Sequence, residues 1–353
     1  MSLAARIADR IRSGGPMSVA EYMHVCLHDP RDGYYATRPA LSAEGDFITA
    51  PLVSQVFGEL IGLWIVELWR QMGAPSPFRL VEMGPGDGTL MSDLLRAAGR
   101  APGFTEAADV WLVEPSLPLR SLQKVRLGPA PRQVDRLDEI PGGAPVLLVA
   151  NEVLDCLPTR QWERRDGAWM ERRVGVEGGE LVFGLAPAPP LVAAPDSAPE
   201  GAVFEHSPAQ EALGSDIAAR IARDGGAALL VDYGRAEPGL GDTFQAVRGH
   251  RREDPLAHPG LADLTVHADF PSVLAAARRE EIETAGPVGQ GRFLRALGLE
   301  ARAEALARAR PEAAPRIRRQ VERLAAPDQM GELFLAAALH SPGLKPPGFG
   351  DAP

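Results

Sequence analysis

The sequence contains little cysteine and no long uninterrupted hydrophobic run. Cys26 and Cys156 are the only cysteines in 353 residues, and their separation supplies neither a disulfide framework nor a CxxC motif. This scarcity suits a reducing compartment rather than secretion. The most apolar segment, residues 53–73, includes three charged residues, whereas a membrane-spanning helix needs roughly 20 apolar ones. We therefore expect no membrane span and interpret this segment as a buried helix.

Positive charge is also in the minority. The chain has 37 Lys+Arg against 47 Asp+Glu, a formal net charge of -10. Because phosphate contacts need clustered positive charge, this balance argues against a nucleic-acid partner and favours a basic substrate. Residues 1–16 carry three arginines but lack the apolar core of a signal peptide, so we expect a short helix there. A transit peptide would share the same arginine bias.

Short apolar runs alternate with helical patterns after Pro75. Near-continuous apolar runs of this length are typical of parallel strands that helices cover on both faces. The order predicts a doubly wound, mostly parallel α/β sheet of the Rossmann-like class. The expected strands are 79–83, 109–114, 144–153, 227–234 and 331–339, and the first crossover helices are 89–99 and 116–127.

The stretch LVEMGPGDGTL (80–90) joins the first of these strands to a helix. Gly84, Gly86 and Gly88 allow a sharp turn and a close approach of backbone to a ligand. Their G-x-G-x-G spacing is tighter than the dinucleotide fingerprint G-x-G-x-x-G. Glu82 and Asp87 place negative charge at the turn, which opposes phosphate and suits a cationic ligand. A tight turn with no ligand is the alternative.

Glu114 lies at the end of the next expected strand. A carboxylate at this position can accept hydrogen bonds from both hydroxyls of a ribose. A solvated strand end is the other interpretation. A ribose-bearing ligand with a cationic remainder indicates S-adenosyl-L-methionine (SAM) rather than NAD.

Several further motifs occur in an order that resembles the MidA family of SAM-dependent methyltransferases, which includes the mitochondrial assembly factor of respiratory complex I. The resemblance spans roughly residues 18 to 340. Its motifs are GDFITAP (45–51), SQVFGELIG (54–62), the glycine turn, NEVLDCLP (151–158), VDYG (231–234), DLTVHADF (263–270) and GELF (331–334). The chain departs from the family pattern at Leu52, Cys156 and Gly289.

The resemblance implies a seven-stranded methyltransferase sheet with added helical segments, SAM as cofactor, and an arginine of a complex I core subunit as methyl acceptor. It implies four parts: an N-terminal helical extension (1–74) that contributes to the site, a SAM-binding core (75–260) with an inserted loop region near 160–215, a helical addition over the substrate cleft (261–326), and a final strand with a flexible tail (327–353).

The resemblance also assigns roles to individual residues. The three glycines match the SAM turn, Glu114 matches the ribose-binding acid, and Asn151 with Glu152 matches the motif beside the methyl group. Because a guanidinium stays protonated at neutral pH, carboxylates must hold it while its proton is lost. We expect Glu152 and Asp155 to face the guanidinium, with Asp46 of GDFITAP as a further catalytic candidate. A capping role is the alternative for Asp155 and for Asp46.

Four residues are predicted to bind the substrate: Tyr35, Thr49, His267 and Arg292. Turn packing explains Tyr35 equally well, and a buried, hydrogen-bonded histidine is the alternative for His267. The sequence predicts no metal site, because no acidic or thiol ligand set accompanies His24 and His28.

Three functions remain open: a protein arginine methyltransferase that supports complex I assembly, a methyltransferase for a small metabolite, and a SAM-binding assembly factor without activity. The protein is expected to be cytoplasmic in a bacterial host and to lie in the mitochondrial matrix in a eukaryotic one. Monomer and homodimer are both open.

Overall fold

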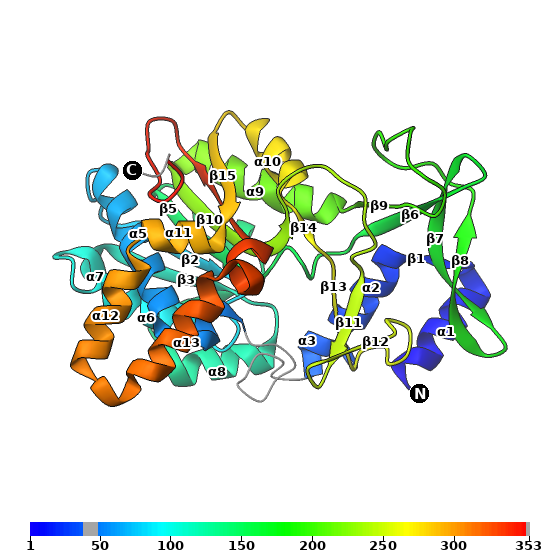
Figure 1. Ribbon diagram of the computed structural model, residues 1–353, viewed down its shortest axis with the longest axis horizontal. Helices are drawn as coiled ribbons and strands as arrows, with labels where there is room; N and C mark the ends of the chain where they lie inside the picture. The colour runs from blue at the N-terminus through cyan, green and yellow to red at the C-terminus, as the bar shows by residue number, and fades with distance from the viewer. Residues whose placement is uncertain (38–48, 351–353) are drawn as a thin grey trace.

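The computed structural model describes residues 1–37 and 49–350 (Figure 1). Its centre is an eight-stranded sheet: seven strands follow the order β15-β16-β10-β5-β2-β3-β4, and the short β14 (Ala268–Asp269) also pairs with β10. Five of these seven strands are parallel: β2 (Phe78–Met83), β3 (Ala108–Val113), β4 (Arg132–Val134), β5 (Val146–Asn151) and β10 (Gly226–Arg235). β16 (Phe334–His340) is antiparallel to β10, and β15 (Glu283–Gly289) is antiparallel to β16. The doubly wound α/β prediction is confirmed.

Both faces of the central strands are buried, as their sequences predict. Alternate residues point to opposite faces of a strand. Leu147 and Val149 of β5 therefore join the hydrophobic cluster on one face, and Leu148 and Ala150 join the cluster on the other. The first face is covered by α5 (Gln55–Gln71) and α6 (Thr89–Ala98), and the second by α9 (Pro208–Asp224) and α10 (Phe270–Arg278).

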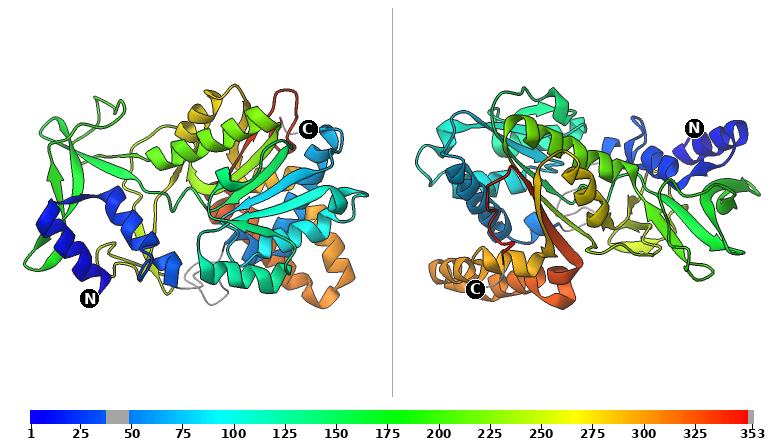
Figure 2. Two further views of the ribbon diagram at one scale, coloured as in Figure 1. Left: turned by 180° about the vertical axis from the view of Figure 1, so that it is seen from behind. Right: turned by 90° about the horizontal axis from the view of Figure 1, so that it is seen from above.

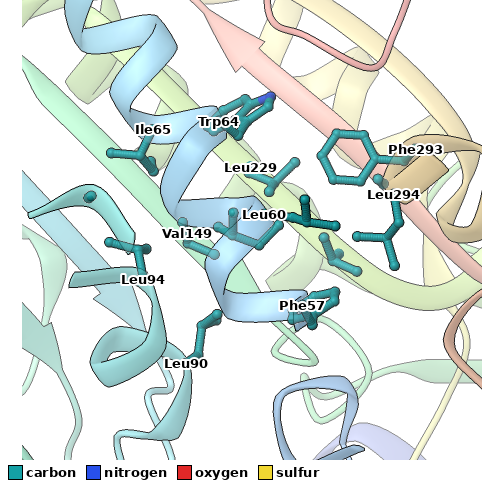
Figure 3. Close-up of a cluster of buried hydrophobic side chains, with 14 of the residues drawn as sticks. Phe57, Leu60, Trp64, Ile65, Leu90, Leu94, Val149, Leu229, Phe293 and Leu294 are labelled. Atoms are coloured by element: carbon teal, nitrogen blue, oxygen red, sulfur yellow. The ribbon is translucent and has the colours of Figure 1, made fainter. Parts of the chain in front are cut away.

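The buried helix predicted at residues 53–73 is α5, which begins at Gln55 after the short α4 (Ala50–Val53). In Figure 3, Phe57, Leu60 and Trp64 of α5 lie among side chains of α6, of the central strands and of α11 (Gln290–Ala296). A Cβ at Gly62 would come within 2.7 Å of the Leu94 carbonyl oxygen, so glycine at this position allows α5 and α6 to pack closely.

The region near 160–215, expected to be an inserted loop, forms a sheet instead. β6 (Arg160–Arg165), β7 (Ala168–Glu177), β8 (Glu180–Ala186), β9 (Val203–His206) and the N-terminal β1 (Met17–Ser18) make five antiparallel strands. The expectation failed because RQWERR and AWMERRVGVE mix charged and apolar residues and lack the continuous apolar run of a strand that is buried on both faces. Residues 187–202 between β8 and β9 contain no helix or strand, as their Pro- and Ala-rich composition indicates.

This antiparallel sheet belongs to a second lobe. Its hydrophobic core joins α1 (Leu3–Gly14) and α2 (Val19–His28) to β7 and to a three-stranded sheet of β11 (Gln245–Arg248), β12 (Arg251–Glu253) and β13 (Asp263–Thr265). Figure 2 shows this lobe beside the central sheet, with the N-terminus in the second lobe and the C-terminus in the first. The N-terminal extension and the chain after β10 are thus brought together by packing.

Residues 261–326 are less helical than expected. After α10 the chain forms β15 before α11, α12 (Leu299–Ala309) and α13 (Ala314–Ala325). The sequence did not predict β15 because Gly286 and Pro287 interrupt the pattern of a strand. Proline is tolerated here because β15 is an edge strand, where the missing N–H is not needed for pairing.

The C-terminal tail does not fray up to residue 350. The Trp64 indole Nε1 donates to the Pro347 carbonyl at 3.2 Å, the Gln71 Oε1 accepts the Lys345 N–H at 2.9 Å, and the Phe349 ring packs on Phe293. The expectation of a flexible tail fails here because polar groups of α5 and an aromatic ring of α11 supply partners that proline-rich composition does not reveal.

Within the ranges that the structure describes, no helix has the length and apolarity needed to cross a membrane. The same ranges contain no group of three or more His, Cys, Asp or Glu side chains arranged to hold a metal ion.

Candidate functional site

A cavity of about 280 Å³ lies at the carboxyl ends of β2, β3 and β5, where ligand sites of open α/β sheets form. Its other walls come from α2, α3 (Tyr34–Thr37), α4 and β13, so both lobes contribute. Among the described residues that line it there is no lysine or arginine. Seven of the lining residues are acidic: Glu82, Asp87, Glu114, Asp135, Glu152, Asp155 and Asp263.

Two glycines of the glycine turn, Gly84 and Gly86, line this cavity, whereas the third, Gly88, does not. Gly84, Gly86 and Gly88 have φ of 61°, 54° and 84°, in the left-handed region that favours glycine. A Cβ at Gly84 would lie 2.9 Å from Cγ2 of Val153, on the chain that follows β5. The turn therefore needs glycine both for its backbone conformation and for its contact with the β5 end.

The two acids of the turn have different surroundings. Asp87 accepts from the Thr89 N–H at 2.9 Å and pairs with Arg126 at 2.6 Å, so its charge is already compensated. Glu82 is buried, and desolvation together with the nearby Asp87 raises its pKa to about 8. Glu82 is thus mostly protonated at neutral pH, which differs from the charged role expected for it.

Glu114 is held at the end of β3 by a network that includes the glycine turn. Its Oε1 accepts the Ser116 N–H at 2.8 Å, and the Gln123 Nε2 lies 3.4 Å from its Oε2. The same Gln123 amide donates to the Gly86 carbonyl at 2.8 Å. Burial raises the pKa of Glu114 to about 7, against the lowering effect of these hydrogen bonds. Gln123 was not predicted, because nothing in the pattern of residues 116–127 marks it as more than a polar helix residue.

The end of β5 is strained. Glu152 has φ of 54°, a conformation that is costly for a residue with a side chain and is common at functional sites. Its Oε1 accepts from the Ala50 N–H at 3.2 Å and from the Asn151 amide at 3.1 Å, which joins the cavity wall of α4 to β5. Burial and the neighbouring Asp155 raise the pKa of Glu152 to about 7.

Three further polar residues line the same cavity as Glu152: Asp155, Asp263 and Tyr35. Asp155 lines the cavity, and burial raises its pKa. Asp263 at the start of β13 accepts from the Tyr35 hydroxyl at 3.0 Å, so Tyr35 and Asp263 meet across the cavity wall from segments 228 residues apart. Asp263 was not predicted as a site residue, although the motif DLTVHADF that begins with it was noticed.

Not every predicted site residue reaches the cavity. Thr49 and Tyr35 line it, whereas His267 and Arg292 do not. The His267 ring packs edge-on against Tyr233, and the exposed Arg292 on α11 donates to the Gly350 carbonyl at 3.0 Å. Arg292 was misplaced because α11 packs on α5 beside the sheet face rather than at the strand ends. Asp46 lies outside the described residues.

The cavity fits SAM by the chemistry of its walls. A buried polar atom without a hydrogen bond costs about 1–3 kcal/mol, so a bound molecule that supplies the missing partner is stabilised at such a site. Four buried side-chain oxygens of the cavity have no partner within the described residues: Glu82 Oε2, Thr89 Oγ1, Asn151 Oδ1 and Asp155 Oδ1. Glu82 belongs to β2 and Thr89 begins α6, whereas Asn151 ends β5 and Asp155 lies in the segment that follows β5.

Comparisons with known proteins agree with this geometry. Residues 60–288 match the family described as "Putative S-adenosyl-L-methionine-dependent methyltransferase". The mitochondrial protein arginine methyltransferase NDUFAF7 homolog of Drosophila melanogaster is 38% identical, over 96% of this chain and 84% of that protein. NDUFAF7 of Homo sapiens, also named as mitochondrial, is 33% identical over 94% of this chain and 81% of that protein.

One solved structure resembles this chain over nearly its whole length. A protein from Burkholderia thailandensis bound to S-adenosyl-homocysteine superposes with a TM-score of 0.82 at 27% identity, and the match covers 99% of this chain and 93% of that one.

Proposed function

The chain belongs to the family of SAM-dependent methyltransferases, and from this premise we propose that it methylates an arginine side chain of a protein substrate. The observation that carries the proposal is the acidic lining of the cavity, with no lysine or arginine among its described members. A guanidinium is a planar cation that carboxylates recognise through paired, charge-assisted hydrogen bonds. The name of the relatives, protein arginine methyltransferase, supports the same acceptor.

SAM would lie over Gly84, Gly86 and Gly88, with its ribose on Glu114 and its methionine end near Asn151, and when bound it supplies an electrophilic methyl group. Gln123 supports this arrangement because its side-chain amide contacts both Gly86 and Glu114. These contacts link the glycine turn to the proposed ribose-binding carboxylate. The two partnerless oxygens at Thr89 and Asn151 would then gain hydrogen-bond partners.

Glu152, Asp155 and Asp263 would hold the acceptor. Their carboxyl groups line one side of the cavity, and Tyr35 fixes the orientation of Asp263. Glu152 would orient the guanidinium and accept the proton that the methylated nitrogen loses. Its pKa of about 7 suits proton acceptance near neutral pH, because a base works best when its pKa is close to the operating pH.

The finer identity of the substrate comes from the family resemblance. We propose that the acceptor belongs to a core subunit of respiratory complex I and that methylation supports assembly. The protein would act where that subunit is made available: in the cytoplasm of a bacterial host, or in the mitochondrial matrix of a eukaryotic one, as the names of the relatives favour.

The test is to incubate the protein with methyl-labelled SAM and lysate from cells that lack its gene, and to locate the label by mass spectrometry. We expect methylated arginine in a complex I subunit, and no label with Glu152→Gln. Label confined to small molecules would contradict the proposal. SAM binding without label on any acceptor would instead identify an assembly factor without activity.

A further inference from the structure

A basic surface lies on the outer helices α12 and α13 of this acidic chain. Six arginines on these helices and on the turn between them are exposed: Arg308, Arg310, Arg316, Arg318, Arg319 and Arg323. The same segment also carries four exposed glutamates, Glu300, Glu304, Glu312 and Glu322, and Glu304 pairs with Arg308 at 3.6 Å. Arginines still outnumber glutamates here, whereas the chain as a whole has a formal charge of -10. Clustered charge of this kind attracts a partner of opposite sign.

Three of these arginines form a continuous stripe on α13, which we call the arginine stripe: Arg316, Arg319 and Arg323. Residues three and four positions apart lie on the same face of a helix, and these three have spacings of three and four. Within the part of the chain that the structure describes, none of them forms a hydrogen bond with its side chain or an ion pair. The adjacent face of α13 carries the buried Ile317 and Leu324, which anchor the helix, while the three arginines of the stripe are exposed.

The helix that carries the arginine stripe packs against α4, which contributes to the wall of the cavity. Gln320 lies four residues after Arg316 and three before Arg323, on the side of the stripe, and its Oε1 accepts from the Ser54 hydroxyl at 3.4 Å. Ser54 is the residue that follows α4, and Pro51 and Leu52 of α4 line the cavity. In Figure 1, α13 and α12 form a pair at the edge of the main lobe, with α13 nearer the centre of the molecule.

We propose that the arginine stripe docks an acidic segment of the protein substrate that flanks the acceptor arginine. This rests on the proposed arginine methylation. A cavity lined by carboxylates beside a strip of arginines is complementary to a basic residue beside acidic ones. The stripe extends about 10 Å along the helix, at roughly 1.5 Å per residue. An extended peptide covers this length with about three residues.

Two other anionic partners fit the surface less well. Single-stranded nucleic acid is held largely by stacking on aromatic side chains, and α12 and α13 contain none. A helix that lies on an anionic membrane buries large apolar side chains in the lipid. No large apolar side chain is exposed on either helix, and the structure describes both helices completely.

The test compares two fluorescent peptides that carry one arginine each. Three aspartates flank the arginine of the first, and three asparagines replace them in the second. Binding is measured by fluorescence anisotropy in the presence of S-adenosyl-homocysteine, so the readout does not depend on turnover. A triple variant of the stripe carries Arg316→Glu, Arg319→Glu and Arg323→Glu. Its affinity for the acidic peptide should be lower than that of the wild type by about tenfold or more, and its affinity for the neutral peptide by less than about twofold.

A matched variant controls for net charge. The control replaces three exposed arginines elsewhere in the chain: Arg100→Glu, Arg165→Glu and Arg251→Glu. It changes the net charge by the same amount as the stripe variant and should leave the affinity for each peptide within about twofold of the wild-type value. Equal weakening of both peptides by the stripe variant would overturn the proposal, as would tighter stripe-dependent binding of single-stranded RNA or of phosphatidylserine vesicles. Stripe-dependent binding without methylation of either peptide would contradict the proposed activity and leave the docking surface intact.

Discussion

Asp232 at the end of β10 holds the backbone of Leu154, whose N–H its Oδ2 accepts at 2.8 Å. The same oxygen accepts the Asp155 N–H at 3.2 Å, and the carbonyl of the preceding Val231 accepts the Glu152 N–H at 2.8 Å. The carboxyl end of one strand therefore shapes the loop that carries the proposed acceptor carboxylates. Asp232 belongs to the motif VDYG, for which the sequence suggested no role.

Replacing Asp232 with Leu should destabilise the protein. The change removes the acceptor of three N–H groups, those of Leu154, Asp155 and Tyr233. Each buried N–H left without a partner costs about 1–3 kcal/mol, so the two contacts to the loop alone should lower the free energy of unfolding by roughly 2–6 kcal/mol in urea denaturation. Asp232→Asn keeps one acceptor oxygen and should recover most of this loss. If the Leu variant unfolds at the same urea concentration as the wild type, Asp232 does not hold this loop.

Gly86→Val should abolish SAM binding. Its φ of 54° disfavours any side chain, and its carbonyl is the acceptor for Gln123. We expect the affinity for S-adenosyl-homocysteine in calorimetry to fall by about a hundredfold or more. Gly143→Val is the matched control, because Gly143 has a φ of 83° and a side chain there would face open space. Gly143 precedes β5 and so lies at the amino end of this strand, whereas the cavity lies at the carboxyl end. Both variants carry similar strain, so an equal loss of affinity would show that the turn does not contact the cofactor.

Glu152→Gln should reduce turnover while SAM still binds. The amide keeps the shape and accepts the Ala50 N–H, but it cannot take a proton or carry the charge that holds a guanidinium. We expect kcat on an arginine peptide to fall by about 10²-fold or more, the usual contribution of a positioned base. Glu163→Gln, outside the cavity, supplies a control with the same change of charge. Unchanged methylation would remove Glu152 from the proposed role.

Peptide affinity should rise as pH increases from about 6 to 8. Only an ionised carboxylate pairs with a guanidinium. Because the pKa of Glu152 is raised to about 7, the ionised fraction of Glu152 increases as pH rises through this range. The effect on folding has the opposite sign. Because the folded pKa lies above the usual 4.5, the contribution of Glu152 to stability is complete below about 4.5 and is lost as pH rises through about 7. Glu152→Gln should flatten the slope of peptide affinity and should reduce the slope of stability, to which Glu82 and Glu114 contribute in the same pH range. A peptide affinity that is flat across this range would contradict the raised pKa.

Much of the central fold could be predicted because the information is local. The strands β2, β3, β5 and β10 are short apolar runs whose boundaries differ from the predicted ones by at most two residues. The glycine turn, Glu114 and Glu152 could be found for the same reason, because each lies next to the end of a predicted strand.

The second lobe and β15 could not be predicted in this way. The strands of the second lobe come from residues 17–18, 160–206 and 245–265. Their mixture of polar and apolar residues identifies a strand only when it is known which face is exposed to solvent. Asp263 and Tyr35 lie far apart in the sequence, so neither carries a local signal of their hydrogen bond.

The sequence by itself determined the alternating α/β core, the glycine turn and the cofactor class, since strand period, turn conformation and charge at a strand end depend on neighbours along the chain. Only the tertiary structure decided which carboxylates face one another. Burial and mutual repulsion raise the pKa of Glu152, and the helix that carries the arginine stripe packs against α4, which contributes to the cavity wall. These properties arise between segments distant in sequence and depend on how the two lobes and the outer helices pack.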